Sequence, residues 1–115
     1  MNSEGTTVYI AMNHFLVKAG YEEIFEGIWR DRDSKLHEFD GFIRFEMLKG
    51  NEDEDGYVLY ASQAIWTDQS AFKGWLDSRD FKDSHDRPKP RVEYKGHPRF
   101  IGFEALDDLA INRAG

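Results

Sequence analysis

Apolar side chains recur along four segments of the chain in the manner of β-strands. Residues 7–18 form an almost unbroken run of apolar, strand-forming side chains, which predicts a strand buried on both faces. Apolar and charged residues alternate over 42–49, and apolar residues fall on both parities over 57–67, so each segment predicts a further strand. Residues 99–106 predict the fourth strand.

Two other segments carry the spacing of helices. Over 21–41 the apolar residues recur at helical spacing with charged residues on the other side, which predicts one long amphipathic helix. These apolar residues are Tyr21, Ile24, Phe25, Ile28, Trp29 and Leu36. Residues 70–85 predict two short helices in succession. Asp68 or Ser70 is suited to cap the first of these helices, and Ser78 opens the second.

The remaining segments predict a turn, a loop and the chain ends. The acidic residues 50–56, bounded by glycines, predict a solvated hairpin turn. Residues 86–98 hold all three prolines without any periodicity and predict a flexible loop. We expect residues 1–6 and 108–115 to be frayed. No internal repeat divides the chain, so we expect a single domain over 1–115.

The order strand, helix, strand, strand, helices, strand predicts an α+β fold. We expect a ferredoxin-like antiparallel sheet of four strands with its helices on one face. The helices of one chain cover only one side of such a sheet, yet the predicted strands are apolar on both sides. A chain of 115 residues is small enough that an uncovered sheet face weighs against its stability. We therefore expect a second copy to cover the bare face, which makes the protein a homodimer.

Composition and charge argue against several classes of function. The formal net charge of -7 argues against general nucleic-acid binding, which needs a basic face toward phosphates. Cysteine is absent, so the chain offers no disulfide, no thiolate ligand and no iron–sulfur site. The first residues lack the basic start and apolar core of a signal peptide, and no run reaches the length of a membrane span. We expect a cytoplasmic protein.

Three residues stand out as candidates for chemistry. His85 ends the second short helix beside a proline-rich loop, where its imidazole either binds a metal or heme iron or caps the helix. Asn13 interrupts a buried strand, so its carboxamide needs a partner, which is either an internal hydrogen bond or a ligand. Trp75 is either a core residue or the wall of a cleft that His85 faces.

The other histidines and the basic loop are weaker candidates. Alternation along the strand sends His14 away from Asn13, to the far face or a subunit interface. His37 is expected to be solvated, and His97 to be a turn residue. Basic residues outnumber acidic ones over 86–99, which is typical of an anion-binding loop or of a solvated one. These basic residues are Arg87, Lys89, Arg91, Lys95 and Arg99.

The order and spacing of Asn13, Trp75 and His85 on a ferredoxin-like pattern resemble the Isd-type heme-degrading monooxygenases of the antibiotic biosynthesis monooxygenase superfamily. The resemblance extends from Tyr9 to Leu106. The segment 96–104 is most similar to the branch associated with heme uptake in alpha-proteobacteria. The other strings that carry the resemblance are Met12-Asn13, Phe39-Asp40-Gly41-Phe42, Ala71-Phe72-Lys73-Gly74-Trp75-Leu76 and Phe81-Lys82-Asp83-Ser84-His85.

This resemblance implies a dimeric α+β barrel with one heme in each subunit. It makes His85 the proximal ligand of the heme iron. It also makes Asn13 a hydrogen-bond donor to bound oxygen on the other side of the heme, and Trp75 the ring that bends the porphyrin. Trp29 stands where the family usually has a smaller aromatic residue. The further heme contacts that we expect are Trp29, Arg32 and Arg87.

The function that the resemblance implies is that of a heme oxygenase in iron acquisition. Such an enzyme uses O2 and electrons from a separate reductase to open the porphyrin ring, and it releases iron and a linear tetrapyrrole such as biliverdin. The sequence has no flavin or nicotinamide fingerprint, so electrons are expected to come from outside. One alternative is a cofactor-free monooxygenase acting on an aromatic polyketide or quinol. Another is a non-catalytic protein that binds or carries heme.

Overall fold

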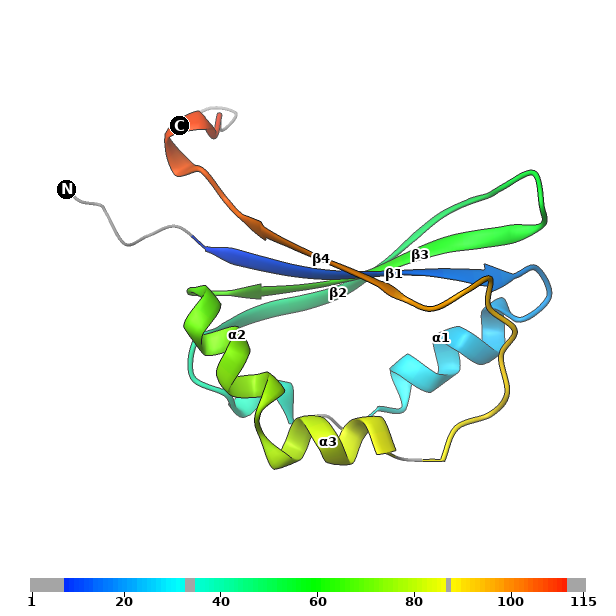
Figure 1. The fold of residues 1–115 in the computed structure, drawn as a ribbon, viewed down its shortest axis with the longest axis horizontal. Helices are drawn as coiled ribbons and strands as arrows, with labels where there is room; N and C mark the ends of the chain where they lie inside the picture. Colours follow the sequence, from blue (N-terminus) through cyan, green and yellow to red (C-terminus); the bar gives the residue numbers. More distant parts are fainter. Residues whose placement is uncertain (1–7, 33–34, 87, 112–115) are drawn as a thin grey trace.

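The fold is a four-stranded antiparallel sheet that carries its helices on one face (Figure 1). The computed structural model describes residues 8–32, 35–86 and 88–111, and within 83–86 it describes the backbone alone. No helix among these residues has the length and apolar character needed to cross a membrane. The elements in chain order are β1 (Tyr9–Lys18), α1 (Glu22–Arg30), η1 (Leu36–Glu38), β2 (Phe42–Glu52), β3 (Tyr57–Trp66), α2 (Gln69–Leu76), α3 (Arg79–Asp86), β4 (Arg99–Glu104) and η2 (Asp107–Leu109).

The strands lie side by side in the order β2, β3, β1, β4, and every neighbouring pair is antiparallel. This arrangement confirms the predicted ferredoxin-like α+β fold, because the first and third strands occupy the centre and the helices connect the strands across one face. The predicted strands differ from the observed ones by a few residues at their ends. In the hairpin the acidic turn is shorter than predicted, since β2 continues to Glu52.

The prediction of one long helix over 21–41 is wrong. Helix α1 ends at Arg30, and a separate 3-10 turn, η1, begins at Leu36. Residues 30–34 include no apolar side chain, so this stretch has nothing to bury against the sheet as a continued helix. Lys35 then adopts a left-handed backbone conformation with φ of 58°, which a helix does not accommodate. The chain therefore turns at this point and leads η1 toward α2.

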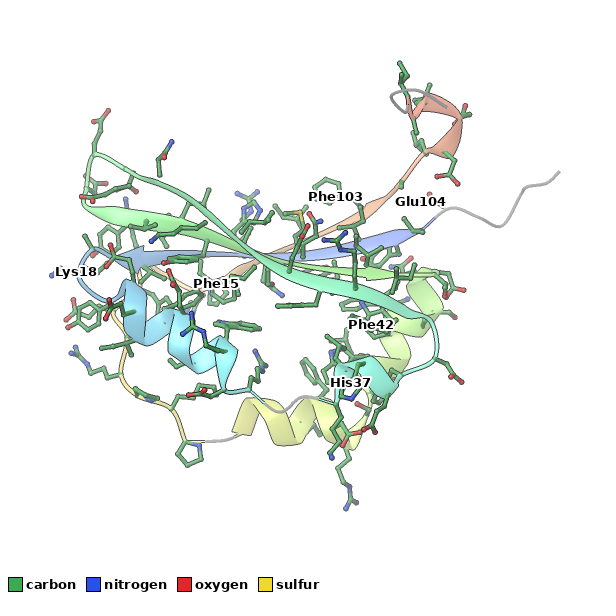
Figure 2. The ribbon with its side chains drawn as sticks, turned by 180° about the vertical axis from the view of Figure 1, so that it is seen from behind. Phe15, Lys18, His37, Phe42, Phe103 and Glu104 are labelled. Carbon is green, nitrogen blue, oxygen red and sulfur yellow. The ribbon has the colours of Figure 1, made fainter. Side chains whose placement is uncertain are left out.

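The two faces of the sheet differ sharply in burial. On the helix face, β1 buries Ala11, Phe15 and Val17. The alternate residues of the same strand are only half-buried, so the prediction of a strand buried on both faces does not hold within one chain. Figure 2 shows Phe103 on the side away from the helices and Phe15 on the helix side. The apolar side chains that the register places on the open face are Ile10, Met12, Leu16, Leu48, Leu59, Ala61, Ile65, Ile101 and Phe103.

Helix α1 is fastened to the sheet by a buried tyrosine. The Tyr60 hydroxyl donates a hydrogen bond of 2.5 Å to Glu26 Oε2, and the Tyr60 side chain is only 1% exposed. Burial and this bond to the carboxylate raise the pKa of Tyr60. The same bond, supported by the charge of Lys49 at 3.5 Å, lowers the pKa of Glu26. Tyr60 therefore stays a neutral donor and Glu26 a charged acceptor at neutral pH.

We predict that Tyr60→Phe lowers the free energy of unfolding by about 1–2 kcal/mol, because it removes a hydrogen bond to a charged acceptor. Because the Glu26 side chain is partly exposed, water can replace the hydroxyl as its hydrogen-bond donor in Tyr60→Phe, which limits the loss of stability. Glu26→Gln keeps an acceptor for the hydroxyl and should cost less. Urea unfolding of the three proteins measures the difference, and a Tyr60→Phe variant as stable as the wild type would contradict the assignment.

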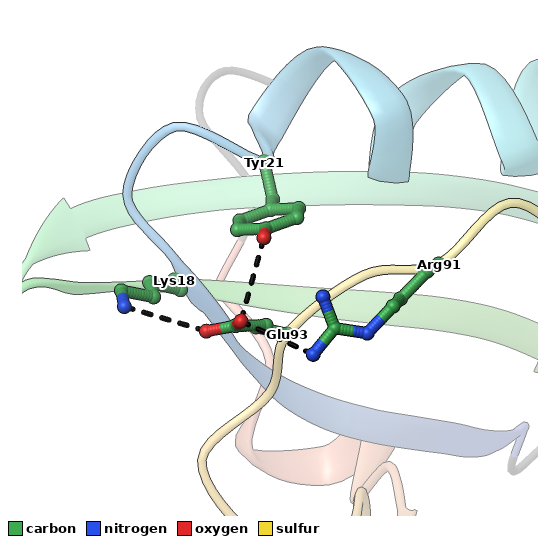
Figure 3. Close-up of polar contacts among 4 residues, drawn as sticks. All are labelled: Lys18, Tyr21, Arg91 and Glu93. Carbon is green, nitrogen blue, oxygen red and sulfur yellow. Dashed lines mark hydrogen bonds and ion pairs between the residues drawn. The ribbon is translucent and has the colours of Figure 1, made fainter.

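The second half of the 86–98 stretch is held against β1 (Figure 3). The backbone N–H of Lys18 donates to the carbonyl of Glu93 at 2.9 Å, and that of Lys95 donates to Leu16 at 2.9 Å. Glu93 also receives contacts from three side chains: Lys18 Nζ at 3.3 Å, Arg91 at 3.2 Å and the Tyr21 hydroxyl at 3.4 Å. The Lys18 contact is the largest of the influences that lower the pKa of Glu93. This part of the chain therefore extends the β4 edge of the sheet.

We predict that Glu93 makes the free energy of unfolding depend on pH in the acidic range. Its pKa in the folded protein lies below the ordinary 4.5, so the unfolded chain binds its proton first as the pH falls. The stabilising contribution is present above the unfolded value and is lost as the pH drops through the folded value. Urea midpoints at about pH 6 and about pH 3.5 should therefore differ less in Glu93→Gln than in the wild type. Glu54→Gln, at an exposed turn position, is the matched control and should keep the wild-type difference.

Candidate active site

A cavity of about 570 Å³ lies between the helix face of the sheet and the layer formed by η1, α2 and α3. Its volume falls in the range of roughly 300–1,000 Å³ that is typical of sites for small molecules and cofactors. Most of its lining is aromatic or aliphatic. The lining residues are Ala11, Asn13, Trp29, Arg32, Leu36, His37, Phe42, Phe45, Ser62, Ala64, Trp66, Phe72, Trp75, Leu76, Phe81 and Phe100.

Small side chains in the two central strands make room for this cavity. In the β1–β3 register Ala11 stands opposite Ala64, and Asn13 stands opposite Ser62. Both pairs lie on the helix face and line the cavity. They form its floor, and their short side chains leave the space above the sheet open to a ligand.

Pairs of large aromatic residues lie at the two ends of this floor, along both strands. Toward one end Tyr9 stands opposite Trp66, and toward the other Phe15 stands opposite Tyr60. Trp66 and Tyr60 are almost fully buried, at 0% and 1% exposure. Each belongs to a separate core cluster, one beneath α2 and the other beneath α1. The cavity thus occupies the gap between two packed cores, and their rigidity maintains its shape.

Trp75, from α2, forms one wall of the cavity and is 7% exposed. Its ring makes edge contacts with two other rings, Phe39 at 5.0 Å and Phe81 at 5.6 Å between centroids. Gly41 permits the close approach of η1 to α2 that brings Phe39 there, since a Cβ at Gly41 would lie 2.5 Å from the Cβ of Ala71. The orientation of the Trp75 ring is therefore fixed before any ligand binds.

Trp29 and Arg32 form the wall on the α1 side. The Trp29 ring is stacked on Phe45, with 5.7 Å between centroids and 14° between planes, and it meets Phe15 edge-on. The guanidinium of Arg32 lies 4.2 Å from the centre of the Trp29 ring. Burial lowers the pKa of Arg32, but an arginine remains charged at neutral pH. This wall combines a flat aromatic surface with one positive charge.

The corner between α2 and α3 is built by its capping residues. Asp68 caps α2, since its carboxylate accepts from the backbone N–H of Ala71 at 2.8 Å, whereas Ser70 lies within the helix. The Ser78 hydroxyl donates to the carbonyl of Trp75 at 2.6 Å and accepts from the N–H of Phe81 at 3.1 Å. One serine therefore joins the end of α2 to the start of α3, as its place in the sequence predicts.

The structure brings four of the six candidate heme contacts, Asn13, Trp29, Arg32 and Trp75, to one cavity. His85 lies in the last turn of α3, but its side chain is outside the described residues, as is the whole of Arg87. Helix α3 itself reaches the cavity through Phe81.

Two further polar residues line the cavity, of which Ser62 was not a sequence-based candidate and His37 was expected to be solvated. His37 lines the cavity although 76% of its side chain is exposed, so it stands at the rim. Ser62 is buried in the floor, and only the strand register reveals that it lies opposite Asn13. His14 projects to the opposite face, as alternation predicts. In the basic loop, Lys95 pairs with Asp55 at 2.6 Å and Arg91 pairs with Glu93. These ion pairs leave less of the positive charge of the loop for an anionic ligand.

The chain is similar in sequence to a known family of proteins. Residues 8–87 match the family model for antibiotic biosynthesis monooxygenases, so the chain belongs to that family. A heme oxygenase of Staphylococcus saprophyticus, described as staphylobilin-producing, is 29% identical over 79 residues, which cover 69% of this chain and 74% of that protein.

Solved structures of a heme-degrading protein and of a cofactor-independent oxygenase share the fold. MhuD, a heme-degrading protein of Mycobacterium tuberculosis that was solved with two hemes in its active site, has a TM-score of 0.68 and 20% identity. The match covers 90% of this chain and 99% of MhuD. SnoaB, a cofactor-independent oxygenase of Streptomyces nogalater, has a TM-score of 0.63 and 21% identity, with coverage of 85% and 92%. At these identities the likeness concerns the fold alone.

Proposed function

We propose that the cavity binds heme and that the protein degrades it, using O2 and electrons from a separate reductase to open the porphyrin ring. Iron and a linear tetrapyrrole such as biliverdin are the products. The observation that carries the proposal is the arrangement of the cavity, in which the Asn13 amide on the sheet and the fixed ring of Trp75 on α2 line one aromatic-walled space. The staphylococcal relative, a heme oxygenase, supports the choice of substrate.

Heme suits the chemistry of this lining. The porphyrin is a flat apolar ring with two carboxylates, and the cavity offers flat aromatic walls together with the charge of Arg32 at the α1 side. Arg87, which follows α3 in sequence, is our second candidate for a residue that binds a carboxylate of the porphyrin. Trp29 provides the stacked surface on which one edge of the ring would rest.

Each of the three central residues has a role that matches its side chain. His85 would bind the iron through its imidazole, from the α3 side. Asn13 would donate a hydrogen bond to oxygen on the side of the sheet, because a carboxamide stabilises charge that develops there. Trp75 would press on the porphyrin, since the edge contacts with Phe39 and Phe81 prevent its ring from moving aside.

We also propose that two copies pair through the open sheet faces, which would complete a dimeric α+β barrel. The exposed apolar residues on that face support this, with Phe103 47% and Leu59 38% exposed. Such residues are costly to leave in water and are typical of an interface. We place the reaction in the cytoplasm, as a step of iron acquisition related to the heme-uptake branch of alpha-proteobacteria.

The dimer gives a direct prediction. Phe103→Glu should convert the protein to monomers at micromolar concentration, because two carboxylates would be buried in a symmetric apolar interface. Sedimentation or light scattering measures the mass. Glu104→Gln, on the neighbouring position of β4 that faces the other side, should remain dimeric. A monomeric wild type would contradict the proposed barrel.

A second candidate function is that of a cofactor-independent monooxygenase on an aromatic polyketide or quinol, and the fold shared with SnoaB favours it. Titration with hemin separates the two. The proposed heme oxygenase should give a sharp Soret band that saturates at one hemin per chain. Absence of that band, together with oxidation of a quinol in the absence of hemin, would favour the second candidate.

A further inference from the structure

Ser62 is the one buried polar residue among the residues whose side chains the structure describes, at 4% exposure. It lies near the middle of β3, directly opposite Asn13 on β1, and both residues line the cavity. Facing side chains of an antiparallel pair lie roughly 5 Å apart. A hydroxyl and a carboxamide therefore stand side by side in a floor whose other members are Ala11 and Ala64.

The side-chain hydrogen bonds among the described residues include none from Asn13 or Ser62, although the neighbouring Gln63 bonds to Glu46. The Ser62 hydroxyl oxygen is not among the described side-chain atoms that are fully enclosed without a partner, so it stays accessible from the cavity that the residue lines. A polar group in such a place is satisfied by a ligand or by water. Ser62 therefore differs from Ser78, whose hydroxyl is fully engaged in the α2–α3 corner.

The need for a small side chain does not explain a serine at this position. Ala64, two residues further along the same face, keeps the floor open with a methyl group alone. Alanine at position 62 would leave the same room without burying a polar group, and serine gains nothing from strand propensity. The hydroxyl itself is what distinguishes Ser62, and the residue lines the cavity.

We propose that the Ser62 hydroxyl donates a second hydrogen bond, beside that of Asn13, to the small oxygen-bearing ligand held between the cavity floor and the plane of the substrate. The inference rests on the proposed heme-degrading function and adds a binding residue to it. Two adjacent donors hold such a ligand in one orientation, whereas a single hydrogen bond from Asn13 leaves the ligand free to rotate. Ser62 thereby helps to aim the oxygen at one edge of the porphyrin.

The test uses azide binding to the ferric hemin complex, because azide is a small anion that accepts hydrogen bonds where O2 would bind. Ser62→Val and Ser62→Thr have nearly the same shape, but only threonine keeps the hydroxyl. We expect Ser62→Val to weaken azide binding about five- to tenfold and Ser62→Thr to stay within about twofold of the wild type. Ser62→Ala introduces no added bulk and should match Ser62→Val if the larger variants fold poorly.

The outcomes separate this inference from the function on which it rests. Equal azide affinities in wild type, Ser62→Val and Ser62→Ala, with an intact Soret band, would overturn the role of Ser62 and leave the heme site standing. Failure of the wild-type protein to form a Soret band would overturn the proposed function and the inference with it. In a successful test, Asn13→Ala also weakens azide, and the double variant with Ser62→Ala weakens it further.

Discussion

The His85→Ala protein should degrade heme no faster than free hemin decays under the same reductant. Without cysteine in the chain, an imidazole is the strongest iron ligand that the sequence offers, and α3 carries His85 in its last turn. Loss of the ligand leaves the iron without an axial donor, so turnover should fall to background and the Soret band should broaden and shift. Reductant-dependent loss of the Soret band and chelator-detected iron release measure the effect.

The matched control for this variant is His97→Ala. His97 is exposed and lies outside the cavity lining, so its loss should leave both the spectrum and the turnover unchanged. Addition of free imidazole should restore a sharp Soret band to His85→Ala, since the small ligand can occupy the space that the side chain leaves. Full turnover in His85→Ala would remove His85 from the account of iron binding.

The second large effect is expected from Asn13→Ala, which should slow heme degradation about 100-fold without destabilising the protein. The rate falls because the amide is the donor proposed to stabilise charge on the reacting oxygen. The stability holds because the Asn13 side chain makes no hydrogen bond to another described residue, so its removal breaks none and relieves a half-buried polar group. Single-turnover decay of the hemin complex gives the rate, and urea unfolding of the apoprotein gives the stability.

A lower rate of heme degradation together with an unchanged free energy of unfolding distinguishes a binding residue from a structural one. If the Asn13 side chain stabilised the folded state, Asn13→Ala would lower the free energy of unfolding, as we expect for Tyr60→Phe. A variant that is both unstable and normal in turnover would show that the carboxamide completes the strand and has no part in the reaction. Asn13→Ser, which keeps a short donor, should retain more activity than Asn13→Ala.

Runs of apolar, strand-forming residues were enough to predict the four strands of the sheet. Because side chains alternate along a strand, the sequence places Asn13 and His14 on opposite faces, and the structure agrees. The capping serine at position 78 predicted the division between α2 and α3 for a similar reason, since a short hydroxyl satisfies the first N–H groups of a helix. These features depend on local chemistry alone.

Features that depend on contacts between distant segments could not be predicted in this way. Leu36 follows Trp29 by seven residues, which is a helical spacing, but the helix ends at Arg30 because Lys35 turns the chain and Leu36 packs with the α2 cluster instead. The importance of Ser62 follows only from the register that sets it opposite Asn13. The bond between Tyr60 and Glu26 likewise joins residues 34 positions apart, for which the sequence gives no signal.

The measurement that tests the central claim most directly is a single turnover of the wild-type hemin complex in air. After stoichiometric loading, a chemical reductant is added and the absorption spectrum and released iron are followed together. We predict that the Soret band decays, that the absorption of a linear tetrapyrrole appears, and that about one iron is released per heme. A Soret band that persists under reductant and oxygen, with no iron released, would contradict it and identify a protein that holds heme without degrading it.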